Sequence, residues 1–299
     1  MTALFNRRTL FAELMLLNIA VAWGLGFPLM KDAMALHGIW TLLWLRFALA
    51  ALLVLPFALR RARDINRSTV LAGAVLGVLL FLAFAFLIGG LQYTSAANTG
   101  FLAGLTMLFV PLLERLLWRR PLHAGVKWSV LLGLLGLAVL SQVHAVRPGL
   151  GDVLVLVGAM FSALQIIATD QLAPRHNAEW LTVVQLVLAA TLFAAACIPT
   201  GQPLWPAVCD GGLWRALLLT AGFATAFAFW VQMRFQEHTT PQRAALIFNL
   251  EPLFGALFAW WLLGEHIGGH VWLGGLLIVA AMMVSGLWPQ KPQAAARSQ

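Results

Sequence analysis

Long apolar stretches dominate this chain, and they limit the folds that it can adopt. Ten such stretches follow one another along the sequence, separated by short polar connections. A helix needs about 20 mostly apolar residues to cross a bilayer, and these stretches lack the polar alternation of a membrane β-barrel strand. The expected spans are 11–35, 39–59, 69–91, 96–117, 124–143, 151–172, 179–199, 213–233, 242–262 and 268–288.

The composition argues against a soluble domain. Apolar residues make up 61% of the 299 residues, and charged residues make up only 10%. A soluble domain carries about 25% charged residues. We therefore expect an all-α membrane protein.

The two halves of the chain resemble each other in sequence. The segment that starts at Tyr93 is repeated at His238, and in this alignment Gly104 corresponds to Asn249. Each copy holds five of the expected spans, and because five is odd, the second copy enters the membrane from the opposite side. The sequence predicts two inverted five-helix repeats. We expect a tail over 1–10, repeats over 11–143 and 151–288, a periplasmic linker over 144–150 and a second tail over 289–299.

The basic residues indicate which side each loop faces. If the N-terminus is cytoplasmic, most of the 19 Lys and Arg residues fall on the cytoplasmic side. This bias follows the positive-inside rule, so we expect both termini to be cytoplasmic. It also accounts for the net charge of +8 without a nucleic-acid partner.

The sequence lacks the motifs of the main alternative classes. It contains no His-Glu-x-x-His, no Gly-x-Ser-x-Gly and no Gly-x-x-x-x-Gly-Lys loop, so we expect no enzyme, no catalytic or metal-binding residues, no cofactor and no ATPase subunit. Inverted repeats are typical of secondary transporters, which bind substrate near the bilayer midplane and expose it alternately to each side. A channel with inverted halves stays open as an alternative.

The candidate substrate-binding side chains are aromatic rings and amides that lie on one face of an apolar span. Such a side chain either packs against a neighbouring helix or lines a cavity, and the sequence leaves both readings open. The candidates are Trp23, Phe27, Phe81, Phe84, Tyr93, Asn98, Phe161, Gln165, Gln185, Phe227, Trp230 and Asn249.

Arg46 is a charged candidate inside the second span. It lies about 10 Å from the outer end of that helix, at 1.5 Å per residue. A charge at such a depth is costly and is usually functional or paired. Arg46 therefore either anchors a substrate carboxylate, or reaches the interface or the carbonyls of a neighbouring helix.

Prolines and cysteines give two further expectations. Pro28 and Pro111 lie inside spans, and because proline removes a backbone hydrogen bond, we expect kinks at both. Cys197 and Cys209 fall on the outer side, where disulfides persist. A disulfide and two free thiols both remain open.

Several short motifs resemble a known family. They are Trp23-Gly24 with Lys31, Leu45-Arg46-Phe47, Tyr93-Thr-Ser-Ala-Ala-Asn98, Asn249-Leu-Glu251-Pro252 and Leu262-Leu-Gly264-Glu265. The chain resembles the EamA-type members of the drug/metabolite transporter superfamily over 11–288. The resemblance implies a central cavity between the two repeats, in a multi-pass protein of the bacterial inner membrane. It also implies a monomer or weak homodimer that exports aromatic and other neutral amino acids.

A comparison within this superfamily bears on the substrate charge. The four-helix multidrug pumps carry a glutamate eight residues before a Leu-Met-Lys lysine, and here that position is Trp23. A cavity of rings and amides with little acid suits a neutral or zwitterionic solute. The alternative is a nucleotide-sugar or sugar-phosphate carrier, which would need two or more basic residues deep in the cavity. Glu251, Asp170 and His238 are the candidates for proton coupling, and facilitated export is equally open.

The topology can be tested directly. Tags at both termini should be inaccessible to impermeant reagents in intact cells and accessible after permeabilisation, because the basic loops hold both ends in the cytoplasm. A C-terminal tag that is accessible from outside would contradict an even number of spans.

Overall fold

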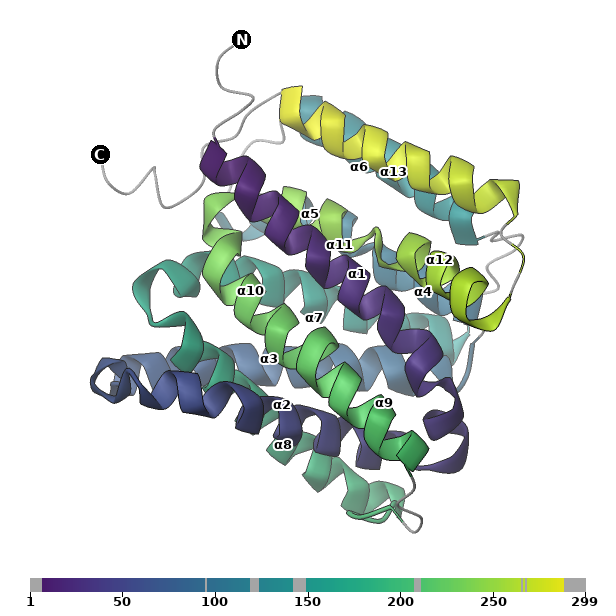
Figure 1. Ribbon diagram of the computed structural model, residues 1–299. Helices are drawn as coiled ribbons and strands as arrows, with labels where there is room; N and C mark the ends of the chain where they lie inside the picture. Colours follow the sequence, from purple (N-terminus) through teal and green to yellow (C-terminus); the bar gives the residue numbers. More distant parts are fainter. Residues whose placement is uncertain are drawn as a thin grey trace.

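The computed structural model describes residues 7–94, 96–118, 124–141, 149–206, 211–264, 266 and 268–287, and these residues form a bundle of long helices without strands (Figure 1). Within these residues, nine helical segments are long and apolar enough to cross a membrane, and a tenth apolar helix is slightly shorter. The prediction of an all-α protein is confirmed.

The first repeat contains five of the expected spans, the fourth of which is divided in two. Its helices are α1 (Arg7–Leu36), α2 (Ile39–Leu59), η1 (Ala62–Asp64), α3 (Arg67–Leu91), α4 (Ala96–Gly104), α5 (Thr106–Trp118) and α6 (Ala124–Ser141). Asn66 sets the start of α3, because its side chain accepts a hydrogen bond from the Thr69 amide at 2.8 Å.

The second repeat follows the same order, with more interruptions. Its helices are α7 (Leu150–Leu172), η2 (Ala173–Arg175), α8 (Ala178–Thr200), α9 (Gly211–Ala221), the π-helix η3 (Gly222–Phe227), α10 (Ala228–Phe235), η4 (Gln236–His238), α11 (Pro241–Phe248), α12 (Glu251–Leu263) and α13 (Gly269–Leu287). Asn177 caps α8 through the Trp180 amide. Thr240 caps α11, with Pro241 in the first turn.

The fourth span is broken at Leu105, a position that the sequence did not single out, and the kink expected at Pro111 stays a prediction. Pro111 lies inside α5, whereas α4 ends at Gly104 and α5 begins at Thr106. The Thr106 hydroxyl donates to the Ala103 carbonyl at 2.7 Å and also lies 3.2 Å from the Ala159 carbonyl. A side chain that competes for a helix carbonyl beside a glycine favours an end to the helix there.

The ninth span is broken at the equivalent place, between α11 and α12. Asn249 and Leu250 form a turn there, and the Asn249 amide donates to the Ala245 carbonyl at 2.9 Å. A Cβ atom on Gly104 would lie 2.5 Å from Asn249 Oδ1. The two positions that the sequence aligns therefore meet in space, and only glycine leaves room for the asparagine.

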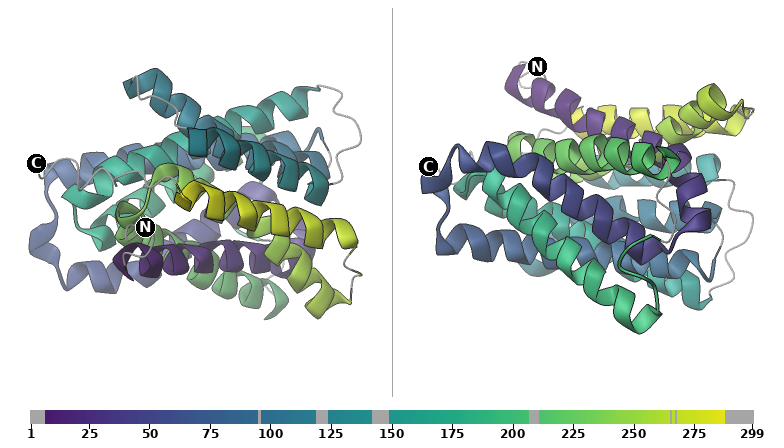
Figure 2. Two further views of the ribbon diagram at one scale, coloured as in Figure 1. Left: turned by 90° about the horizontal axis from the view of Figure 1, so that it is seen from above. Right: turned by 60° about the horizontal axis from the view of Figure 1, so that its bottom comes forward.

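Helices from the two repeats pair with their own equivalents. Helix α2 packs along α8, and α6 packs along α13, as Figure 1 shows for the second pair. Helix α3 contacts α7 in the same way that α1 contacts α9 and α10. Figure 2 shows the resulting single bundle from two further directions. Such reciprocal pairing is what a pseudo-two-fold relation between two repeats produces.

Glycines permit the closest of these contacts. A Cβ atom on Gly90 of α3 would lie 2.6 Å from Val155 Cγ2 and 2.8 Å from the Gly151 carbonyl of α7. A Cβ atom on the neighbouring Gly89 would have no atom within 4 Å. Small residues that let two backbones approach are common in membrane helix interfaces.

These adjacent glycines provide a matched test of the packing. Gly90→Ala should lower the free energy of unfolding by about 1–3 kcal/mol, because overpacking forces α3 away from α7. Gly89→Ala should have little effect, or stabilise the protein slightly through helix propensity. Thermal unfolding of the detergent-solubilised variants measures both, and equal shifts in Tm would contradict the close contact.

Cys197, one of the two cysteines, lies at the outer end of α8. Cys197 is buried and carries a free thiol, which lies 3.5 Å from the Phe193 carbonyl. Cys209 lies outside the described residues. Cys197 has no disulfide partner among the described residues, and its pairing with Cys209 stays an open prediction.

Candidate functional site

A carbonyl group of the π-helix is the centre of the candidate site. The Ala224 oxygen in η3 accepts one hydrogen bond from Trp23 Nε1 of α1, at 2.9 Å, and another from Arg46 Nη2 of α2, at 3.1 Å. A π-helical turn leaves carbonyls without their regular helical partners, and such turns are frequent at functional sites. Two spans of the first repeat thus bind one span of the second repeat near its middle.

Arg46 is also held by the next residue of the π-helix. Its Nε atom donates to Thr225 Oγ1 at 2.6 Å, and that hydroxyl lies 3.0 Å from the Thr220 carbonyl. Binding to neighbouring backbone, one of the two roles that the sequence left open, is therefore observed. The Nη1 atom has no hydrogen-bond partner among the described residues, and the side chain is only partly buried. One edge of the guanidinium remains available to a ligand.

Three predicted rings lie around a buried pair of phenylalanines. The fully buried Phe47 and Phe193 lie with their ring centroids 5.1 Å apart. Phe81 contacts Phe193 at 5.1 Å, and Phe84 contacts Phe47 at 5.4 Å. Trp23 packs against the same cluster. These three predicted rings are partly buried, whereas Phe47 and Phe193 form the closed interior behind them.

Gln165 belongs to a buried amide network. It lies 3.0 Å from Gln232 Nε2 of α10, which also donates to Gln236 Oε1 at 2.9 Å. Gln236 Nε2 in turn donates to the Ile166 carbonyl of α7 at 2.6 Å. Because polar groups in the membrane interior need partners, this network accounts for Gln165 as a link between α7 and α10.

Gln185 of α8 is different. Its side chain is fully buried, and neither amide atom has a hydrogen-bond partner among the described residues. The Thr169 hydroxyl of α7 is in the same condition. An unsatisfied buried polar group costs about 1–3 kcal/mol, so water or a ligand at Gln185 would be stabilising.

The other predicted residues are spread more widely. Phe161 stacks on Phe86 with centroids 5.7 Å apart, and Phe227 packs against a second core cluster. Tyr93 lies in the turn after α3 and is 64% exposed. Asn249 lies at the helix break. The side chains of Phe27 and Asn98 lie outside the described part of the chain.

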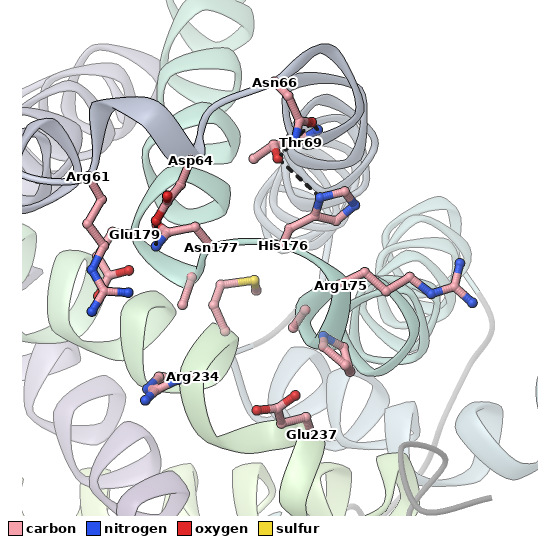
Figure 3. A pocket seen from close by; sticks show the side chains of 14 residues that line it. Arg61, Asp64, Asn66, Thr69, Arg175, His176, Asn177, Glu179, Arg234 and Glu237 are labelled. Atoms are coloured by element: carbon pink, nitrogen blue, oxygen red, sulfur yellow. Dashed lines mark hydrogen bonds between the residues drawn. The ribbon is translucent and has the colours of Figure 1, made fainter. Parts of the chain in front are cut away.

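One end of the bundle carries a charged cavity of about 430 Å³ (Figure 3). We call it the basic end, because its connections hold many of the arginines. Figure 3 shows Arg61 and Glu179 on one side of the cavity and Thr69 and His176 on the other. Burial lowers the pKa of His176, and the Arg175 charge lowers it further, so the imidazole is neutral near pH 7. The lining residues are Arg61, Asp64, Asn66, Thr69, Ala173, Pro174, Arg175, His176, Asn177, Ala178, Glu179, Met233, Arg234 and Glu237.

This cavity adjoins the predicted Trp230. The Trp230 indole lies 3.5 Å from Glu179 Oε1, and its ring packs against Phe235. Trp230 therefore touches a residue that lines the cavity.

Contacts between the repeats close the basic end. Trp180 Nε1 donates to the Arg61 carbonyl at 2.9 Å, which joins α8 to the α2–α3 connection. Glu13 of α1 binds Arg243 of α11 through two hydrogen bonds of 2.5 and 2.6 Å, and Thr239 donates to the same carboxylate at 2.9 Å. The bidentate pair is a strong interaction because both partners are charged and largely shielded from water.

Sequence reasoning missed several of these residues. Gln232 and Gln236 follow the rule that singled out Gln165, since both are amides at the inner end of an apolar span, one turn apart. Thr225 carries no such signal, because its role depends on the π-helical turn. Among the described residues, no group of three or more His, Cys, Asp or Glu side chains could hold a metal ion.

Comparisons with known proteins agree with the predicted family. The EamA-like transporter family matches residues 10–142 and again 149–287, once per repeat. An uncharacterized transporter of Archaeoglobus fulgidus is 28% identical over 280 residues, which cover 94% of this chain and 87% of the relative. The uncharacterized transporter YyaM of Bacillus subtilis is 22% identical over 283 residues, which cover 91% of this chain and 92% of the relative.

A solved crystal structure shares the fold. The two structures superpose with a TM-score of 0.76 at 20% sequence identity. The superposition covers 92% of this chain and 96% of the chain in the crystal structure. Both halves of the sequence, their pairing in space and these relatives lead to one conclusion. The chain belongs to the EamA-like transporter family of the drug/metabolite transporter superfamily, and it is a multi-pass membrane transporter rather than an enzyme.

Proposed function

We propose that this chain exports neutral amino acids, including aromatic ones, across a bacterial inner membrane by alternating access between its two repeats. The main support is Arg46, a cation inside the second span whose Nη1 atom has no hydrogen-bond partner among the described residues. A substrate carboxylate can bind that atom through charge-assisted hydrogen bonds.

The nearby rings favour a substrate with an apolar or aromatic side chain. Trp23 shares the Ala224 carbonyl with Arg46, and it packs against the cluster that includes the partly buried Phe81 and Phe84. Aromatic pairs add about 0.5–1.5 kcal/mol beyond the burial of their area. A ligand anchored at Arg46 would therefore lie beside rings that can stack on its side chain.

A nucleotide-sugar or sugar-phosphate carrier is the second candidate. Its substrate carries clustered negative charge, so its site would need further basic residues next to Arg46. Among the described residues, the charge that interacts electrostatically with Arg46 is the acidic Glu251. An acid in that place opposes a phosphate and favours a zwitterion.

Alternating access requires the basic end, which we assign to the cytoplasm, to open and close. The Glu13–Arg243 pair joins α1 of the first repeat to α11 of the second. The pair must separate when these helices move apart. Its strength therefore sets part of the balance between the two states.

Substrate competition tests the proposed function. In vesicles that contain the purified protein, phenylalanine, tryptophan, methionine and threonine should compete for transport, whereas ethidium and a sugar phosphate should not. Ethidium has no carboxylate, so it would lose its own hydration and leave the Arg46 charge without a partner, at a cost of several kcal/mol or more. Transport of ethidium without competition by amino acids would contradict the proposal, and preference for the sugar phosphate would favour the second candidate.

Exchanging the charges of the Glu13–Arg243 pair tests whether the basic end opens. Glu13→Arg and Arg243→Glu should each favour the state that is open to the cytoplasm, because each removes charged hydrogen bonds worth about 1.5–3 kcal/mol. A single cysteine at position 169, in a background without Cys197 and Cys209, should then react faster with an impermeant maleimide added to the cytoplasmic side. The double exchange should restore the slow reaction, and unchanged rates in the single variants would count against this role.

A further inference from the structure

Glu251 is a carboxylate in the middle of a membrane span. It is the first residue of α12 and follows directly on the break in the ninth span, which runs from Pro241 to Leu262. A charge at this depth is costly and rarely present without a function.

No contact with a described residue accounts for the Glu251 carboxylate. It makes no hydrogen bond or ion pair with any described residue, and its side chain is only partly buried. Its interaction with Arg46 is electrostatic and acts without contact between the two side chains. A pair that existed only for stability would be expected to close into a hydrogen-bonded contact.

The surrounding contacts place the two charges beside the same stretch of α1. Trp23 and Arg46 bind one carbonyl, that of Ala224. The next residue, Gly24, packs on α12 so closely that its Cβ atom would lie 2.9 Å from the Glu251 carbonyl oxygen. One charge comes from the first repeat and the other from the second, so they flank the interface at which a substrate is expected.

We infer that Arg46 and Glu251 bind the two ends of one substrate, with its carboxylate on Arg46 and its ammonium group on Glu251. This inference rests on the proposed function and narrows it to amino acids with both groups free. A zwitterion completes both ion pairs at once and leaves neither charge uncompensated. An acid without the amine, or an amine without the acid, leaves one protein charge without a partner.

The test compares three ligands that share a phenyl ring. Competition against transported phenylalanine in vesicles gives affinities for phenylalanine, for 3-phenylpropionate, which lacks the ammonium group, and for phenethylamine, which lacks the carboxylate. The wild-type protein should prefer phenylalanine to both. Glu251→Gln should lower the affinity for phenylalanine by about tenfold or more, as the loss of a charged hydrogen bond implies. The affinity of this variant for 3-phenylpropionate should be unchanged or higher. Radiolabelled phenylpropionate binding reports on this variant if its transport is lost.

Two controls separate binding from folding. Glu251→Asp should recover part of the preference for phenylalanine, because it restores the charge on a shorter side chain. The Tm of Glu251→Gln shows whether the variant is folded, and the ratio between the ligands does not depend on how much folded protein is present.

The outcomes distinguish this inference from the proposed function. If the wild type transports amino acids but Glu251→Gln keeps the same preference, the role of Glu251 is wrong and amino-acid export stands. An equal loss of affinity for all three ligands in Glu251→Gln would also contradict the role of Glu251. If the wild type transports no amino acid, the proposed function fails and this inference fails with it.

Discussion

In a bilayer, every backbone N–H and carbonyl group must find a partner inside the protein. At three interruptions of the described helices, a side chain binds a backbone carbonyl. At the break in the fourth span, the Thr106 hydroxyl binds the Ala103 carbonyl. At the break in the ninth, the Asn249 amide binds the Ala245 carbonyl. In the π-helix, Trp23 and Arg46 bind Ala224. At each of these interruptions, a polar side chain thus binds a backbone carbonyl.

The duplicated sequence brings these interruptions together. Equivalent helices pair across the interface, and the equivalent positions Gly104 and Asn249 touch at the two breaks. An interruption in one repeat is therefore packed against the other repeat rather than exposed to lipid. The same arrangement leaves α6 and α13 paired at one side of the bundle, where they support the other spans.

The spans and the family could be predicted because their signals are local in sequence. Length and apolar content indicate a span whatever surrounds it, and Arg46 stood out because charge in lipid is costly. The contacts at the site could not be predicted in this way. The π-helix at Gly222–Phe227 contains nothing that a regular helix would reject, and the partners of its Ala224 carbonyl come from side chains of α1 and α2. The break at Leu105 likewise depends on Thr106 and its neighbour Ala159 rather than on Pro111.

Arg46 shows why the two roles that the sequence left open are compatible. Its Nε and Nη2 atoms bind Thr225 and Ala224, so the orientation of the guanidinium is set before any ligand arrives. A side chain that is already held loses little conformational entropy on binding, which strengthens the contacts made by its remaining edge. A lysine has a single ammonium group and could not bind both backbone and ligand in this fixed geometry. The structural need of the π-helix thus places and orients the cation that a carboxylate substrate requires.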